Sequence, residues 1–295
     1  MNQNQNYNLP GNQFVEDEID LRELFEILWS KKKLIVICTA VSTFIALIYS
    51  ISLPNIYTSK ALLAPAQTEN MNSSFNMSRY SGLASLAGIN LPSSSASSVT
   101  EAIETLSSFA FFKNSILPNI FLPDLMALQS WDAKTNTLTY DEGLYDITNN
   151  TWLKNPSDQI SFDSFKGHFS VSQDVETGFV TVLIKHQSPY VAKVWLDNII
   201  SAINQTLRQD QKKRSLLSIE YLNNQIASSS YTEINQVLSS LIQQETEKLM
   251  LIEVNKDYIF KAIDPPFVAE LKSEPSRTII VLIGILIGGI LGVLT

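Results

Sequence analysis

The sequence predicts an α+β protein in which two transmembrane helices flank one domain outside the bilayer. That domain is expected to combine a membrane-proximal sheet layer with a long projecting helix. Two charge-free apolar stretches near the ends of the chain predict the spans. Between them, alternating apolar residues predict strands, and an uninterrupted helical repeat predicts the long helix. A chain of 295 residues is long enough to bury a sizeable core in that domain.

The first apolar stretch, residues 34–53, predicts transmembrane helix 1, because no charge occurs between Leu34 and Ser59. Its length corresponds to roughly 30 Å of helix, the thickness of a hydrocarbon core. Its position, its length and the acidic residues ahead of it disfavour a secretory signal peptide. The second stretch, residues 278–295, predicts transmembrane helix 2, with a buried core helix as the alternative. Its apolar part reaches only about 24 Å, so we expect a short cytoplasmic tail to be missing from the sequence.

The distribution of lysines predicts the orientation. Residues 31–33 are all lysine, whereas the next basic residue after the first span is Lys60. The positive-inside rule then assigns residues 1–33 to the cytoplasm and residues 54–277 to the far side of the membrane. Within the cytoplasmic tail, residues 17–29 place apolar side chains on one face and predict a short amphipathic helix at the membrane surface.

The outer domain is expected to begin with a strand over residues 57–64 and an irregular segment over residues 67–98. Ser98 and Glu101 form a capping-box pattern, which predicts that a helix begins at Ser98. A turn-rich region, residues 118–165, is expected to hold a small strand layer. Its anchors are four aromatic residues: Trp131, Tyr140, Tyr145 and Trp152.

A hairpin is predicted next, with strands over residues 167–173 and 179–187. The register that keeps both apolar faces coherent pairs Val171 with Val182 and Phe169 with Ile184. In this register the two histidines, His168 and His186, are expected on opposite faces, which disfavours a shared metal site.

The longest helix is predicted to start at Ser188 and Pro189, an N-cap followed by proline at the first helical position. No Gly or Pro interrupts residues 190–227, so this helix extends to roughly 57 Å. A second capping box, Ser230 with Glu233, predicts another helix that runs to about Glu253. A strand over residues 258–263 is expected to return and pair with residues 57–64.

A helix of that length exceeds what the domain needs, so its apolar stripe must be buried elsewhere. Packing against the same helix in neighbouring copies is one solution, and burial within one chain is the alternative. The residues expected to face a neighbouring copy are Val194, Ile199, Ile203, Leu217 and Leu222.

No catalytic, cofactor-binding or metal-ligating constellation is predicted. The single cysteine, Cys38, lies inside the first span, so no disulfide is expected. The basic run at residues 212–214 predicts a solvated helix face, or else a contact with an anionic glycan or a partner. The outer compartment excludes nucleic acid.

Two features of the second span predict contacts in the membrane. Gly284, Gly288 and Gly292 repeat every four residues, which places them on one helix face where another helix can approach closely. Ahead of the span, three prolines are expected to stiffen the approach to the membrane: Pro265, Pro266 and Pro275.

The order of these segments resembles the Wzz-type chain-length determinants, the polysaccharide co-polymerases of Gram-negative bacteria. The likeness rests on DEIDL at residues 17–21 with Leu24 and Trp29, and on PNIYTSKALLAP at residues 54–65. The proline-containing run 264–277 is similar too. The family's even spacing of prolines before the second span is absent, because residues 267–274 contain none. One further segment, residues 129–153, looks like a central insert of some members.

The resemblance implies a non-enzymatic protein without cofactors, located in the bacterial inner membrane with a periplasmic main domain. It implies ring-like homo-oligomers that set the modal chain length of O-antigen in lipopolysaccharide synthesis. The implied partners are further copies of the chain, the membrane polysaccharide polymerase, lipid-linked glycan and membrane lipid.

Three alternatives stay open from the sequence. A relative for capsule or exopolysaccharide export would work with a separate tyrosine kinase. A periplasmic scaffold or sensor would relay a signal through the cytoplasmic helix. A glycan-modifying enzyme needs two positioned carboxylates, and the adjacent pair Asp141 and Glu142 would point apart on a strand.

Overall fold

The computed structural model describes residue 29 and residues 31–66 and 94–294. The chain divides into two compact units, one formed by residues 1–53 with residues 276–295 and the other by residues 54–275. We call them the helical-pair unit and the α+β unit. The amphipathic helix predicted ahead of residue 29, and most of the predicted irregular segment, lie outside the described residues.

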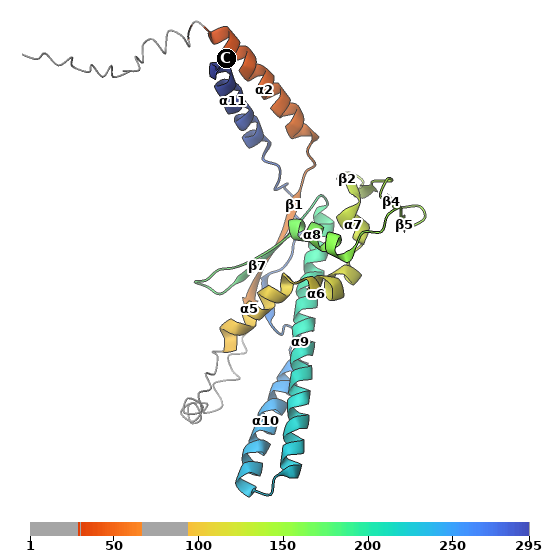
Figure 1. Ribbon diagram of the computed structural model, residues 1–295, viewed down its shortest axis with the longest axis vertical. Helices are drawn as coiled ribbons and strands as arrows, with labels where there is room; N and C mark the ends of the chain where they lie inside the picture. The colour runs from red at the N-terminus through yellow and green to blue at the C-terminus, as the bar shows by residue number, and fades with distance from the viewer. Residues whose placement is uncertain (1–28, 30, 67–93, 295) are drawn as a thin grey trace, which may run out of the picture. The chain divides into compact units, whose positions relative to one another are not determined.

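The helical-pair unit consists of α2 (Lys32–Ser52) and α11 (Arg277–Leu294), which pack along each other (Figure 1). Both are long and apolar enough to cross a membrane. Their outward side chains are mostly aliphatic and exposed, as expected for surfaces that face lipid. Both predicted spans are therefore present as helices.

The α+β unit is built on one antiparallel sheet with strand order β6-β7-β1-β8. The predicted hairpin register is confirmed, because Phe169 pairs with Ile184 and Val171 with Val182. The returning strand also pairs with the first strand as predicted, with Ala262 opposite Leu63. The bounds are β1 Tyr57–Pro65, β6 Phe169–Gln173, β7 Val180–His186 and β8 Phe260–Asp264.

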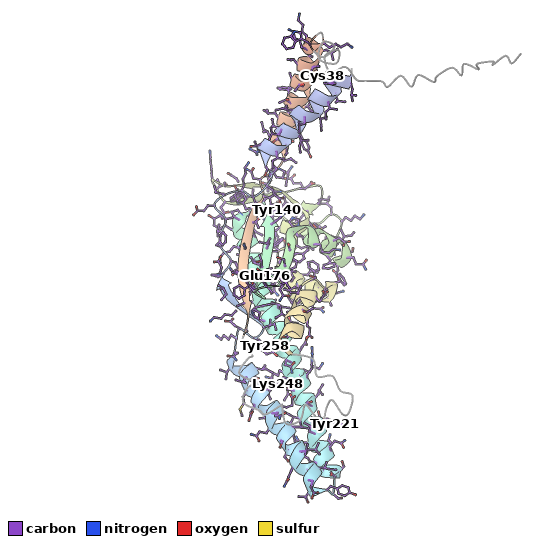
Figure 2. All side chains as sticks on the ribbon, turned by 90° about the vertical axis from the view of Figure 1, so that its left-hand side faces the viewer. Cys38, Tyr140, Glu176, Tyr221, Lys248 and Tyr258 are labelled. Carbon is purple, nitrogen blue, oxygen red and sulfur yellow. The ribbon has the colours of Figure 1, made fainter. Side chains whose placement is uncertain are left out.

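The long helix is α9 (Pro189–Ser228), and it starts as predicted, because the Ser188 hydroxyl accepts the Val191 N–H. It forms a hairpin with α10 (Thr232–Val254) that extends from the sheet, with Tyr221 and Lys248 along it (Figure 2). The first half of α9 covers the sheet, and its apolar residues make the core with those of β1 and β7.

Both predicted capping boxes are wrong. Helix α5 (Ser94–Leu106) begins four residues before Ser98, so Ser98 and Glu101 lie inside the helix. Helix α10 begins at Thr232, so Tyr231 and not Ser230 occupies its N-cap position, and the Tyr231 side chain makes no capping hydrogen bond. Residues 229–231 form the extended connection after α9. A serine followed three residues later by a glutamate also occurs inside helices and just before them, so the pattern alone does not fix the residue at which a helix begins.

The region predicted as turn-rich, residues 118–165, contains the expected small ribbons and, in addition, helices. Leading into it, residues 109–119 form three short helical turns: α6 (Phe109–Phe111), a π-helical turn and a 3₁₀ turn. Helix α8 was missed, although Ser157 caps it and Asp158 occupies its first turn. Because α8 ends at His168, the strand predicted from residue 167 begins at Phe169. The remaining elements are α7 Leu122–Met126, β2 Leu128–Asp132, β3 Thr137–Tyr140, β4 Tyr145–Asp146, β5 Thr151–Trp152 and α8 Asp158–His168.

Candidate assembly surfaces

The glycine face of α11 lies directly against α2. A Cβ on Gly288 would lie 2.7 Å from the Ser42 Cβ and 2.8 Å from the Thr39 Cα, closer than carbon atoms approach. One on Gly292 would lie 2.8 Å from the Ile35 Cα, and one on Gly284 would clash with Ala46. Without a hydrophobic driving force in lipid, helices associate through such close packing and through hydrogen bonds.

A hydrogen bond crosses the same contact. The Ser42 hydroxyl donates to the Gly284 carbonyl over 2.8 Å, which is possible because the glycines let the backbones approach. Gly289, the neighbour of Gly288, has no atom within 4 Å of a Cβ built on it and lies off this face. The chain therefore carries its own control for the packing role of Gly288.

The three prolines are placed around a segment that continues along β1. Pro265 and Pro266 directly follow β8, and Pro275 lies two residues before α11. Between them, the Ser59 hydroxyl donates to the Phe267 carbonyl over 2.9 Å. A β-bridge joins Ile56 to Glu274, so the two chain segments that leave the α+β unit lie side by side.

The residues predicted to face a neighbouring copy fall into two groups. Ile199 and Ile203 are 1% and 0% exposed and belong to the core of their own chain, which corrects that expectation for both. They are buried because the first half of α9 covers the sheet. Val194 and Leu217 are more than half exposed, and Leu222 is half-buried.

The helical hairpin exposes further apolar side chains that the sequence did not single out for assembly. On α9, Leu216 and Tyr221 are exposed beside Leu217. On α10, three exposed apolar residues repeat at three- and four-residue steps, whereas Leu238 and Ile242 are partly buried. We call the exposed residues the outward face of α10: Ile234, Val237 and Leu241.

The three basic residues 212–214 on α9 have different surroundings: two form ion pairs with other helices and one faces solvent. Lys212 pairs with Glu253 of α10, and Arg214 Nη2 lies 2.9 Å from Glu101 Oε1 of α5. Lys213 points into solvent and lines a shallow apolar groove of about 280 Å³ with Leu216 and Leu217. The prediction of a solvated face therefore fits Lys213 best.

The two histidines lie close together, which corrects the expectation that they face opposite ways. Their ring centroids are 6.5 Å apart, because His168 belongs to α8 and not to a strand. Among the residues that the structure describes, no group of three or more potential ligands is placed to hold a metal ion.

His186 is a buried junction between three elements. Its Nδ1 accepts the Ser188 N–H over 2.9 Å at the start of α9, so Nε2 carries the proton and donates to the Asp124 carbonyl of α7 over 3.0 Å. Burial lowers the pKa of His186 to about 4, which keeps the ring neutral near pH 7. Burial also raises the pKa of Asp124, whose carboxylate accepts a hydrogen bond from Tyr140.

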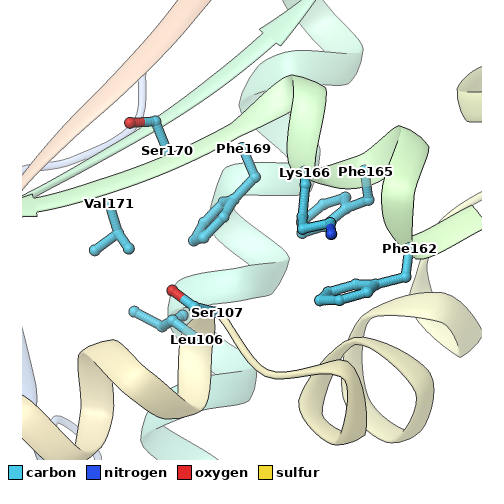
Figure 3. Close-up of a pocket in the computed structure, with 8 residues that line it drawn as sticks. All are labelled: Leu106, Ser107, Phe162, Phe165, Lys166, Phe169, Ser170 and Val171. Carbon is cyan, nitrogen blue, oxygen red and sulfur yellow. The ribbon is translucent and has the colours of Figure 1, made fainter. Parts of the chain in front are cut away.

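An aromatic depression of about 290 Å³ lies between the end of α5 and the junction of α8 with β6 (Figure 3). Phe162, Phe165 and Phe169 form one wall, and the Lys166 ammonium lies 5.0 Å from the Phe162 ring centre and pairs with Asp163. Its other lining residues are Leu106, Ser107, Ser170 and Val171. The lining residues thus provide apolar surface and one ammonium group, and they do not include a general acid and a general base for catalysis.

These features define a protein with two apolar helices and one α+β domain that carries a long helical hairpin. Residues 17–116, about a third of the chain, match the family model described as Wzz, chain length determinant protein. The resemblance predicted from the sequence is thus confirmed over residues 17–116. No curated protein matches the chain.

Two solved structures are similar over most of the chain. One, described as a full-length bacterial polysaccharide co-polymerase, is 15% identical, covers 94% of this chain and 96% of its own, and has a TM-score of 0.40. The other, a fragment of WzzB, polysaccharide co-polymerase from Salmonella Typhimurium, is 13% identical, covers 75% and 100%, and has a TM-score of 0.30. At these values the structural likeness adds nothing to the family match.

Proposed function

We propose that the protein regulates the modal chain length of O-antigen polysaccharide in lipopolysaccharide synthesis, without catalysing a reaction itself. It acts as a homo-oligomer in the bacterial inner membrane, together with the membrane polysaccharide polymerase and lipid-linked glycan. The observation that carries the proposal is the match of residues 17–116 to the chain length determinant family. The two apolar helices support the membrane location.

The proposed topology places the N-terminus in the cytoplasm and the α+β unit in the periplasm. It rests on the three lysines at residues 31–33, directly before the first apolar helix. A reporter that is active only in the periplasm, inserted at the β6–β7 turn, tests it. Activity there, with none for a fusion at the N-terminus, is the expected result, and the reverse pattern contradicts the topology.

The lipopolysaccharide ladder on a gel tests the function. Deletion of the gene is expected to replace a clustered band pattern with a decaying ladder of short chains, and the full-length gene is expected to restore the cluster. An unchanged ladder with an altered capsule or exopolysaccharide would move the role to that polymer. A ladder and surface glycans that both stay unchanged would contradict chain-length control and leave a scaffold or sensor.

We propose that the glycine face holds the two spans together and that assembly depends on this pair. Gly288→Leu forces α11 away from Thr39 and Ser42, whereas Gly289→Leu meets open space. The expected result is a smaller oligomer in detergent for G288L and an unchanged one for G289L. Equal oligomer sizes for both variants would reject the proposal.

We further propose that copies assemble through two different faces of the helical hairpin. One face has Leu216, Leu217 and Tyr221 on α9, beside the basic Lys213, and the other is the outward face of α10. Because the faces differ, the contact is head-to-tail, and such contacts close into rings when the rotation allows it. The glutamates of α10 complement the basic run in charge.

Single charges test both faces. Leu217→Asp and Val237→Asp are each expected to lower the assembled fraction in detergent, by sedimentation or native mass spectrometry. Val175→Asp is the control, because Val175 is 95% exposed at the β6–β7 turn and away from the hairpin. Assembly that is unaffected by L217D and V237D, or lowered equally by V175D, would reject the assignment of these faces.

A further inference from the structure

The small ribbon of β4 and β5 has an apolar outer face. Tyr145 and Trp152 pair across the ribbon and turn inward, with ring centroids 4.9 Å apart. Because side chains alternate along a strand, Leu144 and Leu153 turn outward, and they are 44% and 64% exposed. The two leucines are adjacent, since the Leu153 N–H donates to the Leu144 carbonyl over 3.1 Å. Ile147, at the turn of the ribbon, is 51% exposed.

The neighbouring ribbon of β2 and β3 differs in this respect. Its exposed side chains are polar, namely Gln129, Ser130, Asp132, Thr137 and Thr139. Two neighbouring ribbons thus present different surfaces, and Leu144, Ile147 and Leu153 of the apolar one are not part of the core. Exposed aliphatic clusters of this kind mark contact sites.

Both ribbons lie at the end of the sheet where β1 begins (Figure 1). Trp131 of β2 packs edge-on against Tyr57, the first residue of β1, with ring centroids 5.4 Å apart, and approaches Tyr190 at the start of α9. Tyr140 of β3 contacts Tyr145 of β4, with centroids 6.1 Å apart, which joins the second ribbon to the first.

This end of the sheet is tied to the apolar helices by short segments. Tyr57 follows Leu53, the last residue of the first segment of the helical-pair unit, by four residues, which span at most about 14 Å. On the other side, Glu274 pairs with Ile56 only three residues before α11 begins at Arg277. Neither segment allows this end of the α+β unit to move far from a bilayer that holds α2 and α11.

We propose that the β4–β5 ribbon lies in the headgroup region of that bilayer, with Leu144, Ile147 and Leu153 in contact with lipid. The inference rests on the proposed membrane location. Tyr57, Trp131 and Tyr190 then occupy the depth at which aromatic residues are enriched in membrane proteins. Residues 128–154 contain more acidic than basic side chains, so the contact depends on apolar side chains and not on attraction to anionic headgroups.

Spin labels on single cysteines measure this contact in the full-length protein. The chain has one cysteine, so a Cys38→Ala background accepts one label at a time, and the protein is reconstituted in phosphatidylethanolamine–phosphatidylglycerol vesicles. Leu153→Cys is expected to collide with oxygen more than with a water-soluble nickel chelate. Val175→Cys is the aqueous control, because β7 runs from that turn to His186, which pairs with Tyr57 at the other end of the sheet.

A third position separates failure of the inference from failure of the proposed location. Phe44→Cys lies in the middle of α2 and is expected to give the signature of lipid. An aqueous signature at Phe44 overturns the membrane location and the inference with it. A lipid signature at Phe44 with equal signatures at Leu153 and Val175 overturns the inference alone. A Leu153 label shielded from both reagents also overturns it, because another copy of the chain would then cover the ribbon.

Discussion

Both halves of α9 carry apolar side chains, but these side chains have different surroundings in the two halves. In residues 189–207, the apolar stripe is buried, with Trp195, Ile199 and Ile203 each at most 2% exposed. In residues 208–228, Leu216, Leu217 and Tyr221 are about half exposed or more. The first half packs against the sheet, whereas the second half packs against α10 and leaves these three side chains exposed.

This difference separates folding from assembly along one helix. Apolar side chains on the first half lower the free energy of the folded chain by leaving water. Leu216, Leu217 and Tyr221 on the second half stay about half exposed in the single chain, and under the proposed assembly a neighbouring copy covers them. Substitutions in the two halves are therefore expected to change different measurements.

The largest expected effect comes from Ile203→Ala in the first half. It leaves a cavity beside the sheet, and large-to-small changes of this kind cost about 2–5 kcal/mol of unfolding free energy. Leu217→Ala, the matched change in the second half, is expected to stay within about 0.5 kcal/mol, because its side chain is mostly exposed. Urea unfolding in detergent, followed by tryptophan fluorescence, measures both.

The oligomer size of the same two variants completes the test. L217A is expected to weaken assembly at unchanged stability. If L217A destabilises the chain as much as I203A, the second half of α9 belongs to the folding core and the comparison fails.

The next effect is a pH dependence at the start of α9. The pKa of His186 is depressed to about 4 from an ordinary value of 6.5, so the unfolded chain binds a proton in this range that the folded chain does not. The stability from neutral His186 is complete above pH 6.5 and is lost as the pH falls toward 4, by about 3 kcal/mol in all. The physical cause is burial, because a charged imidazolium would lose its contact with water inside the folded chain.

His186→Asn removes the titration and keeps a donor and an acceptor. Its unfolding free energy is expected to fall less between pH 7 and pH 4.5 than that of the unchanged protein. His168→Asn is the comparison at the neighbouring ring, because among the described residues His168 hydrogen-bonds the Ser164 carbonyl of its own helix and not the start of α9. Equal pH slopes for the unchanged protein and H186N would contradict the role of His186.

Much of the fold was predictable because its signals are local. The Ser188–Pro189 start of α9 and the Phe169–Ile184 register follow from cap chemistry and side-chain alternation, and both were predicted correctly. Helix α8 was missed because its apolar repeat is short. The error at His168 followed from it, since a strand was assumed where the helix continues.

The candidate surfaces were less predictable than the fold. Helical periodicity identifies the apolar stripe of α9, but it does not tell where the sheet beneath the helix ends. Ile203 and Leu217 therefore looked equivalent, although the first is buried and the second is exposed. Whether each residue is buried depends on how far the sheet extends along α9. Residues distant in the sequence set that extent, so the sequence around Ile203 or Leu217 does not show it.

Asn204 is expected to show the next effect. It is the buried polar residue of the first half, and its Oδ1 accepts the N–H groups of Ile259 and Phe260 while its Nδ2 donates to the Phe260 carbonyl, each over 2.9 Å. Asn204→Ala leaves these buried groups unpaired at the start of β8, at a cost of about 1–3 kcal/mol.

Asn223→Ala is the matched control in the second half, where the side chain is exposed. It is expected to leave the urea midpoint unchanged. Equal midpoints for N204A and the unchanged protein would mean that water replaces the lost amide, and that Asn204 does not fasten β8 to α9.

The smallest effect is expected from Arg214 in the second half. Its pair with Glu101 is exposed, with the two side chains 59% and 48% accessible, and such pairs contribute about 0.2–1 kcal/mol, less at high salt. A double-mutant cycle with Arg214→Ala and Glu101→Ala isolates the coupling from the other contacts of each residue. Coupling energies above about 2 kcal/mol, unaffected by salt, are typical of buried pairs and not of exposed ones. Such a value would mean that the second half of α9 is held to α5 within the folded chain, and the division between a folding half and an assembly half would have to move beyond Arg214.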